Sequence, residues 1–280
     1  MRHDSIKAED QTELTRAPLT NLNFMETVKD LQQTTDDHVT TLVLRRPPHN
    51  FVDIEFIKTV ADRLDALDKD PNCRVIVLAA DGRSFCAGAD FGNVASGGQK
   101  MDSEIFYAQA MRLFRTSKPI VAAIQGPAIG AGVGLALVAD FRIACPSSRF
   151  SVNFNRIGFH PGFGLSFTLP RLIGAQQAAR LFYTGERIDG ERATAIGLTD
   201  ELVPDEDVRA RAHEFAREIA VSAPLAVQST RTTLRLGLAK QVEAITAREL
   251  AIQLPQFQSC DFIEGVTAAA QRRPPVFTGK

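Results

Sequence analysis

Residues 126–144 read GPAIGAGVGLALVADFRIA, and residues 84–91 read SFCAGADF. Each of these glycine- and alanine-rich segments follows an apolar run that predicts a buried strand, at 119–124 before the first and at 75–79 before the second. Side chains are nearly absent where both predicted strands end, so a ligand can approach the backbone there. Two turns of exposed backbone N–H groups are suited to bind an oxygen atom on which negative charge develops.

Strands and helices alternate through the first two thirds of the chain. Predicted strands cover residues 38–45, 74–79, 119–124 and Phe141–Ala144, and predicted helices cover residues 57–67, 103–114 and 129–138. This alternation predicts an α/β fold with a parallel sheet and right-handed crossovers.

The character of the sequence changes at two points, which divide it into three regions. Residues 1–22 are polar without usable periodicity and predict a flexible N-terminal tail. Residues 23–204 form the predicted α/β core, and after Pro204 the sequence predicts three helices at about 205–221, 225–237 and 240–258. Residues 205–280 are therefore expected to be a C-terminal helical region.

The composition is that of an ordinary globular protein, with 44% hydrophobic and 23% charged residues. The 32 basic and 33 acidic side chains leave a net charge of −1, which argues against a nucleic-acid surface and a basic membrane patch. The four cysteines are scattered without a C-x-x-C pair and predict reduced thiols rather than a metal site. No apolar run approaches the ~20 residues of a membrane helix, and the N-terminus resembles no secretory signal, so we expect a cytoplasmic protein.

The glycines at 130, 132 and 134 also suggest a dinucleotide-binding turn, which would make the chain a nicotinamide oxidoreductase. That fingerprint requires a third glycine three residues after the second, and Leu135 occupies this position. A phosphate-binding loop would need Gly-Lys-Ser/Thr, which is absent. Close packing of a helix on a strand is a purely structural alternative for the same glycines.

Several short motifs occur in a fixed order from about residue 38 to the end of the chain. They are Arg46-Pro47-Pro48-His49-Asn50, the loop 85–90, the run Lys118-Pro119-Ile120-Val121-Ala122-Ala123 before Gly126, Tyr183-Thr184-Gly185-Glu186-Arg187-Ile188, Ala195-Ile196-Gly197-Leu198, Leu202-Val203-Pro204, and Glu264-Gly265 before Arg272-Arg273-Pro274. Together they resemble the crotonase (enoyl-CoA hydratase/isomerase) superfamily.

The resemblance implies a spiral of ββα units with parallel sheets, followed by C-terminal helices that form a trimerisation region. It also implies that the core binds an acyl-CoA thioester, with the backbone N–H groups of Ala89 and Ala131 as an oxyanion hole that stabilises an enolate. Coenzyme A is then part of the substrate, and no permanently bound cofactor or metal is expected. The residues implied in binding substrate and coenzyme A are Ala87, Ala89, Asp90, Phe91, Gly130, Ala131, Gly134, Phe154 and Phe163.

The sequence departs from the family where a hydratase carries its two glutamates. Alignment puts Gly134 at the first of these positions and Phe154 at the second. The aspartates of dienoyl-CoA isomerases would fall on Gly134 and Gly162. A hydratase needs two carboxylates to hold and activate a water molecule, so hydration by that mechanism is disfavoured.

Few residues remain that could carry a proton. His160 lies in a loop that by alignment borders the acyl pocket, and it is a candidate acid or base, with a structural role as the alternative. Tyr107 is a second candidate, for which a packing role is the alternative. Asn153 or Asn155 could bind the acyl group, whereas we expect Asp90 to cap a helix.

These observations favour an acyl-CoA enzyme that stabilises an enolate but lacks the two-glutamate machinery. Isomerase, decarboxylase, lyase and C–C hydrolase reactions remain open, as does an unfamiliar hydratase-type activity. The alternative is a non-catalytic acyl-CoA-binding homologue. The resemblance also implies a homotrimer or a dimer of trimers, and apolar residues spread around the predicted helix at 242–254 are consistent with burial on more than one side.

Overall fold

The computed structural model describes residues 24–96, 98 and 101–280, so the predicted tail at 1–22 lies outside the described residues. A seven-stranded sheet has the order β1-β2-β3-β4-β5-β7-β10. Its strands β1–β3 pair antiparallel, and β3, β4, β5, β7 and β10 pair parallel. The bounds of these strands are β1 Phe24–Val28, β2 Leu31–Asp36, β3 Val39–Leu44, β4 Val75–Ala80, β5 Ile120–Ile124, β7 Phe141–Ala144 and β10 Glu201–Leu202.

A small second sheet lies beyond the end of β5 and has the order β6-β8-β9. Its strands are β6 Pro127–Ile129, β8 Arg149–Ser151 and β9 Ile188–Asp189. The helices are α1 Ile54–Lys69, α2 Gly92–Ala95, α3 Ser103–Arg112, α4 Ala131–Ala136, α5 Leu165–Ile173, α6 Ala175–Thr184, α7 Gly190–Ala195, α8 Val208–Ala220, α9 Pro224–Leu234, α10 Leu238–Gln256 and α11 Cys260–Ala270, with short 3₁₀ helices η1 Leu113–Arg115, η2 Asn153–Ile157 and η3 Asp205–Asp207. The mixed α/β fold with a largely parallel sheet and C-terminal helices confirms the predicted fold class.

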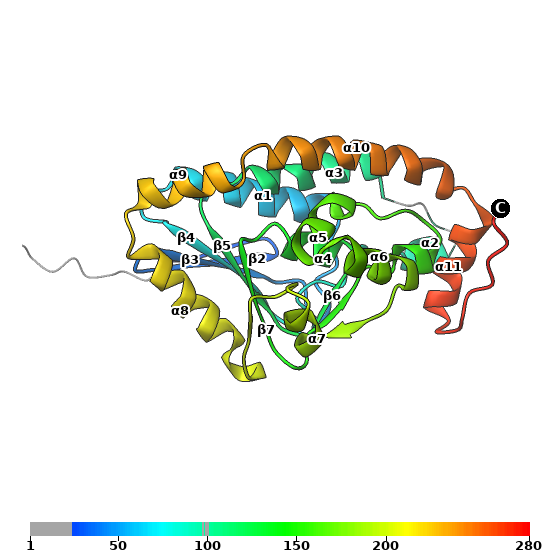
Figure 1. The fold of residues 1–280 in the computed structure, drawn as a ribbon, viewed down its shortest axis with the longest axis horizontal. Coiled ribbons are helices and arrows are strands. Elements are labelled where there is room, and N and C mark those ends of the chain that lie inside the picture. Colours follow the sequence, from blue (N-terminus) through cyan, green and yellow to red (C-terminus); the bar gives the residue numbers. More distant parts are fainter. Residues whose placement is uncertain (1–23, 97, 99–100) are drawn as a thin grey trace, which may run out of the picture.

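Strands β4 and β5 are apolar along their whole length, as expected for strands of a sheet that is covered on both faces (Figure 1). On β4, Ile76 and Leu78 belong to the same buried cluster as α1 and α3. Val77 and Ala79, which alternate with them, belong to a second cluster with α8. Helix α8 therefore covers the sheet, although its sequence follows Pro204, where the composition changes.

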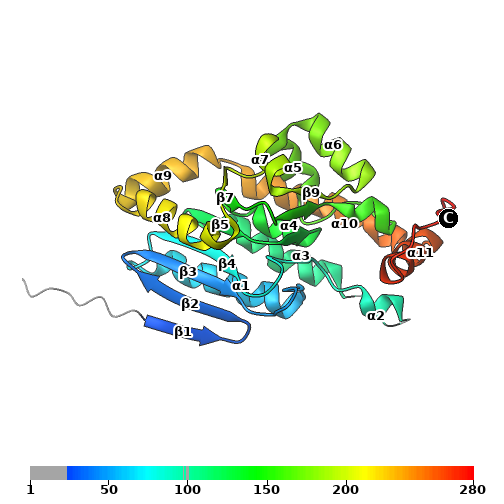
Figure 2. The ribbon, with the colours of Figure 1, turned by 90° about the horizontal axis from the view of Figure 1, so that it is seen from below.

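Strands β1–β3 form one edge of the structure, and helices α5–α7 lie on the opposite side of the molecule (Figure 2). Helix α11 and the short helix α2 lie together at one end (Figures 1 and 2). No helix in the described part of the chain is long and apolar enough to cross a membrane.

Helix α9 is attached to the core through the half-buried carboxylate of Asp140, in the turn before β7. One oxygen of this carboxylate accepts hydrogen bonds from the backbone N–H of Ile120 and from Nε of Arg231, each at 2.8 Å. The other oxygen accepts from Nη1 of Arg235 at 2.8 Å. Asp140 thus orders the turn before β7 and joins the sheet to α9.

Replacing Asp140 with asparagine is expected to lower the free energy of unfolding by about 3 kcal/mol, because the guanidinium of Arg231, only 8% exposed, loses its counter-charge. Urea denaturation measures this loss. Asp62→Asn is the matched control, because this carboxylate pairs with Lys58 and Arg112 while 47% exposed, and its loss should be under about 1 kcal/mol. Equal losses in the two variants would contradict the account.

Candidate active site

The two glycine- and alanine-rich loops meet through backbone hydrogen bonds. The N–H of Cys86 donates to the carbonyl of Pro127 at 3.1 Å, and the N–H of Ile129 donates to the carbonyl of Cys86 at 3.0 Å. A Cβ atom on Gly88 would lie 2.6 Å from the carbonyl oxygen of Ile129, and one on Gly132 would overlap the carbonyl oxygen of Cys86. The loops can approach this closely only because these two positions lack side chains.

A third loop, which follows β3, holds the loop at residues 84–91 in position. Asn50 is fully buried, and its side-chain amide donates to the carbonyls of Asp81 and Ser84 at 2.7 and 2.8 Å. The N–H of Val52 donates to the carbonyl of Gly88 at 2.9 Å. The predicted motif at residues 46–50 therefore supports the backbone next to Ala89.

This arrangement leaves two backbone donors available. Ala131 is the first residue of α4, where an N–H group has no partner within the helix. Neither Ala131 N–H nor Ala89 N–H donates a hydrogen bond to another residue in the described part of the chain. The nitrogen of Ala131 lies 3.6 Å from the position of a Cβ atom on Gly88, the neighbour of Ala89, so both donors belong to one small region.

Both alanines line a cavity of about 900 Å³. The loops after β3, β4 and β6 line it together with α3, η2 and the C-terminal helix α11. Several residues that the sequence singles out also line it, namely Ala87, Asp90, Phe91, Tyr107, Gly130, Asn153 and Phe154. Gly134, His160 and Phe163 are not among its lining residues.

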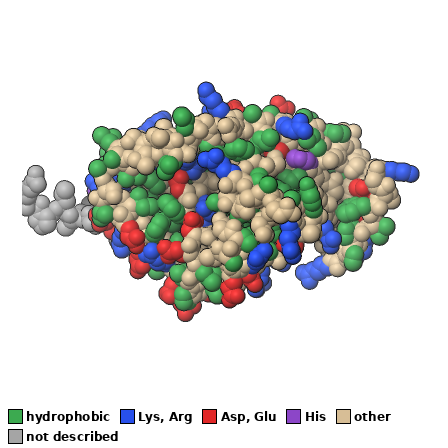
Figure 3. Space-filling view, viewed as in Figure 1, with side chains coloured by type: hydrophobic (Ala, Val, Ile, Leu, Met, Phe, Trp, Pro, Cys, Tyr) green, Lys and Arg blue, Asp and Glu red, His purple; other side chains and the backbone are tan. Residues whose placement is uncertain are grey.

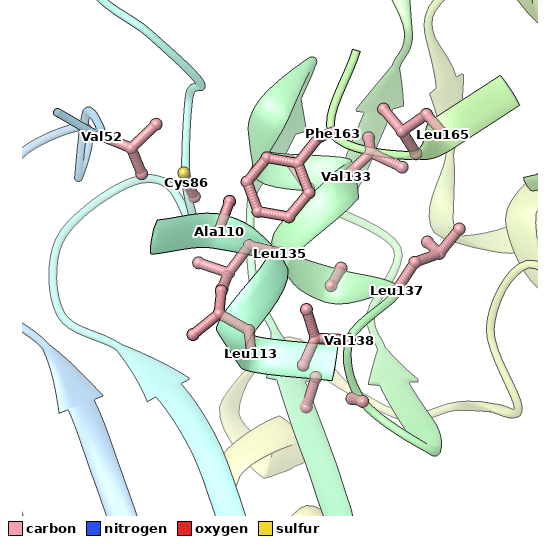
Figure 4. Packing of buried hydrophobic residues seen from close by; sticks show 14 of the residues in the cluster. Val52, Cys86, Ala110, Leu113, Val133, Leu135, Leu137, Val138, Phe163 and Leu165 are labelled. Atoms are coloured by element: carbon pink, nitrogen blue, oxygen red, sulfur yellow. The ribbon is translucent and has the colours of Figure 1, made fainter. Parts of the chain in front are cut away.

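The ring of Phe163 occupies the space next to Gly134. A Cβ atom at Gly134 would lie 2.5 Å from this ring, so any larger residue would require Phe163 to move. Phe163 is 1% exposed and belongs to the same buried cluster as Ala110 and Leu135 (Figure 4). The space beside Gly134, the residue assigned from the sequence to the first hydratase glutamate position, is therefore filled by the hydrocarbon of this ring.

Phe154, assigned from the sequence to the second glutamate position, lines the cavity. Its ring is 6% exposed and approaches to 3.7 Å from the position of a Cβ atom on Gly130, the residue before Ala131. The neighbouring Asn153 lines the cavity, whereas Asn155 is exposed and does not. Of the two asparagines considered from the sequence, only Asn153 can reach a ligand in this cavity.

Tyr107 lines the cavity, and its hydroxyl group has a partner in α10. The hydroxyl donates to Oε1 of Gln253 at 3.1 Å, while Nε2 of Gln253 donates to the carbonyl of His160 at 2.8 Å. Burial is the largest cause of a raised pKa for this phenol. A phenol with a raised pKa stays protonated at neutral pH, so Tyr107 can donate a hydrogen bond but is a weak general base.

His160 makes its contacts away from the cavity. Its Nδ1 lies 2.7 Å from the carbonyl oxygen of Pro161, and its backbone N–H donates to the side chain of Gln256 at 2.7 Å. A carbonyl oxygen can only accept, so Nδ1 carries the proton in this hydrogen bond. The imidazole, predicted as a candidate acid or base, therefore has no direct contact with the cavity in this structure.

Asp90, predicted as a helix cap, accepts a hydrogen bond from the backbone N–H of Gly92 at 2.8 Å. Gly92 is the first residue of α2, so this contact agrees with a capping role. Among the described residues, no group of three or more histidine, cysteine, aspartate and glutamate side chains is arranged to hold a metal ion.

Sequence reasoning did not identify Glu249, a fully buried carboxylate on α10. It accepts hydrogen bonds from the backbone N–H groups of Gly164 and Ser166 at 2.7 and 2.9 Å, and from the hydroxyl of Ser166. It thereby caps α5 and fixes the segment that contains Phe163. The available signal was the polar row Thr246, Glu249 and Gln253, which recurs at helical spacing in an otherwise apolar stretch.

A family model described as enoyl-CoA hydratase/isomerase matches residues 34–280. The chain is 36% identical over 210 residues to a probable enoyl-CoA hydratase of Rhodobacter capsulatus, covering 74% of this chain and 82% of that protein. It is 34% identical to the 1,2-epoxyphenylacetyl-CoA isomerase of Escherichia coli, covering 86% and 95%. The crystal structure of an enoyl-CoA hydratase/isomerase from Pseudoalteromonas atlantica superposes with a TM-score of 0.81 at 28% identity, covering 89% of this chain and all of that one.

Glu249 is expected to make stability depend on pH. Burial raises its pKa from 4.5 to about 6, so the folded state binds this proton more tightly than the unfolded chain. Its contribution to stability is therefore full below about pH 4.5 and is lost as the pH rises through 6. A rise in pKa from 4.5 to about 6 corresponds to about 2 kcal/mol.

Urea denaturation of the wild type and of Glu249→Gln, at several values between about pH 4.5 and 7.5, tests this expectation. The free energy of unfolding of the wild type, minus that of the variant, should fall by about 2 kcal/mol across the range. Glu243→Gln, on the exposed face of the same helix, controls for the loss of one carboxylate. A difference that stays constant or rises with pH would contradict the role given to Glu249.

Proposed function

The chain belongs to the enoyl-CoA hydratase/isomerase family, and from this premise we propose that it binds an acyl-CoA thioester and stabilises the enolate derived from it. One observation carries the proposal: the free N–H groups of Ala89 and Ala131 lie in one region of a large cavity. A thioester oxygen bound by both donors gains negative charge as a carbanion forms at the adjacent carbon. Each such donor typically accelerates the reaction 10²–10³-fold.

The coenzyme A portion of the substrate extends in this proposal toward the exposed end of the cavity. The backbone around Ala87 and Phe91 contacts the adenine and pantetheine, as the family resemblance implies. Asp53 at this end has a side chain that is 52% exposed, which supports an open mouth. Coenzyme A enters and leaves with the substrate and is not a resident cofactor.

The reaction proposed is one that needs no pair of carboxylates next to the thioester. Gly134, packed under the ring of Phe163, and Phe154 replace the two glutamates that would hold a water molecule. Isomerisation, decarboxylation, retro-aldol cleavage and C–C hydrolysis share the enolate and differ in how it is formed. The proton then moves through the substrate itself or through solvent. Tyr107 on α3 lines the cavity and is the residue proposed to donate a hydrogen bond there.

A second candidate function is a non-catalytic acyl-CoA binder. A specific observation favours it: the charged residues among the described residues lining the cavity are Arg46, Asp53 and Asp90, and all three have partners within the protein. Without a free base, the protein would hold an acyl-CoA and leave it unchanged. The two candidates share the binding site and differ only in turnover.

The oligomeric state is a further part of the proposal, and we infer a homotrimer or a dimer of trimers. Four large apolar side chains around α9 are strongly exposed, namely Val221 at 82%, Leu225 at 80%, Leu234 at 72% and Leu236 at 82%. Hydrophobic side chains are visible on the surface at the end of the molecule formed by α8 and α9 (Figure 3). An apolar surface of this kind is stabilised by contact with another copy of the chain.

A cytoplasmic location remains part of the proposal and is supported by four cysteines without disulfides.

Turnover of a panel of enoyl-, 3-hydroxyacyl-, malonyl- and β-ketoacyl-CoA esters tests the catalytic function. We expect at least one ester to react, and Ala131→Pro to reduce the rate 10²–10³-fold, because proline removes the N–H donor at a position where a helix tolerates it. Ala175→Pro is the matched control, since Ala175 is also the first residue of a helix preceded by glycine. A folded Ala131→Pro variant with undiminished turnover would rule out this oxyanion hole.

Multi-angle light scattering tests the oligomeric state. The wild type should show three or six times the mass of one chain, and a Leu225→Glu/Leu236→Glu double variant should show a lower mass, because it puts charges into the apolar contact. Val276→Glu, 73% exposed near the C-terminus, is the control. A stable monomer for the wild type would refute the trimer.

A further inference from the structure

We propose that the inner end of the cavity is a subsite for an aromatic acyl group that carries no negative charge. The proposal rests on the proposed function, because it assumes that the thioester carbonyl is bound by Ala89 and Ala131. It goes further in assigning the chemical class of the acyl group. Three observations carry it: the difference in exposure along the cavity, the arrangement of phenylalanine rings next to the oxyanion loops, and the ion pairs of Arg46, the cation among the described lining residues.

Exposure distinguishes the mouth of the cavity from its inner part. Phe51 is 36% exposed and Asp53 has a side chain that is 52% exposed, so the loop after β3 lies at the mouth. Gly92 of α2 and Ala269 and Ala270 of α11 are also exposed lining residues, so the mouth extends to these two helices. Phe106, Phe154 and Phe159 line the same cavity but are at most 6% exposed. The nucleotide of coenzyme A is large and charged and requires the exposed end, so the acyl group is directed to the buried end.

The buried part of the cavity continues into a cluster of rings in contact with one another, of which Phe91 and Phe257 are half-buried. Phe159 is at its centre, with ring centroids 5.4 Å from Phe154, 5.7 Å from Phe91 and 5.0 Å from Phe257. Phe91 follows Ala89 by two residues, and Phe154 contacts the position next to Ala131. The ring cluster therefore begins beside both backbone donors, where the first carbons of an acyl group must lie.

Helix α3 contributes a second set of rings. Phe106 and Tyr107 both line the cavity, and their centroids are 5.4 Å apart. Phe163 lies behind Phe106 at 6.0 Å and fills the space beside Gly134. The side of the cavity formed by α3 therefore also carries aromatic rings.

The pairing of Arg46 indicates that the acyl group is not anionic. Arg46 donates to Asp30 at 2.7 Å and to Asp53 at 2.6 Å, and its guanidinium lies 4.7 Å from the ring centre of Phe56. A carboxylate on the acyl group would find no unpaired cation among the described residues that line the cavity. Burying that carboxylate without a counter-charge would disfavour binding.

Ring geometry favours an aromatic group over a saturated one of similar size. Most of the ring pairs around Phe159 are edge-to-face, with interplanar angles of 84° to Phe154 and 67° to Phe91. An added aromatic ring can extend this arrangement by placing its edge against a ring face. Such pairs typically strengthen binding about two- to tenfold beyond the effect of buried area, and a cyclohexyl group gains only the area.

Isothermal titration calorimetry with three saturated thioesters tests the proposal. The probes are propanoyl-CoA, 3-cyclohexylpropanoyl-CoA and 3-phenylpropanoyl-CoA, with free coenzyme A as the reference. We expect the phenyl ester to bind at least about tenfold tighter than propanoyl-CoA and about threefold tighter than the cyclohexyl ester.

Two variants test whether the rings of Phe154 and Phe159 cause the preference for the phenyl ester. Phe154→Leu should weaken the phenyl ester about fivefold and change propanoyl-CoA less than twofold, because leucine keeps the apolar contact but removes the ring. Phe159→Leu is a second variant with the same expectation, in case the first does not fold. Phe215→Leu is the control, since that ring packs on Phe141 on the α8 side of the sheet.

The outcomes separate this proposal from the proposed function. Equal affinities for the phenyl and cyclohexyl esters, or for the phenyl ester and propanoyl-CoA, would overturn the aromatic subsite alone. An unchanged preference in both variants would overturn it as well. If no thioester binds more tightly than free coenzyme A, the proposed function falls together with the subsite.

Discussion

The close approach of two strand-end loops is the constraint on which the rest of the site depends. Cys86 exchanges backbone hydrogen bonds with Pro127 and Ile129, and the absence of side chains at Gly88 and Gly132 makes this crossing possible. The crossing brings the unpaired N–H groups of Ala89 and Ala131 into one region, and the large cavity opens in front of them. Every other element of the site either supports these loops or shapes the space that they face.

The C-terminal helices determine what surrounds that backbone. Glu249 and Gln253 of α10 hold the segment that follows η2, which carries His160 and Phe163. This contact holds the segment whose Phe163 ring packs against Gly134, so hydrocarbon fills the space beside that glycine. The two backbone donors and the packing behind them thus depend on distant parts of the sequence, joined by one buried carboxylate and one buried amide.

The central strands and the two loops could be predicted from the sequence, because strands buried on both faces are uniformly apolar and bare loops are rich in glycine. Strands β8 and β9 were missed because two or three residues carry no period. The partners of Gly134, Tyr107 and His160 could not be predicted either. Glu249 and Gln253 lie more than 80 residues from the groups they bind, and only the fold brings them together. His160 was inferred from its loop alone, and its ring contacts Pro161 instead of the cavity.

The central claim, that two backbone N–H groups polarise a thioester carbonyl, can be measured directly on a bound ligand. Infrared difference spectra of an acyl-CoA labelled with ¹³C at the thioester carbonyl report the strength of that C=O bond. The account predicts that the carbonyl stretch moves to lower frequency on binding to the wild type, and that Ala131→Pro reduces the shift while the ligand stays bound. A bound thioester whose carbonyl stretch matches that in water, or whose shift persists in the proline variant, would contradict it.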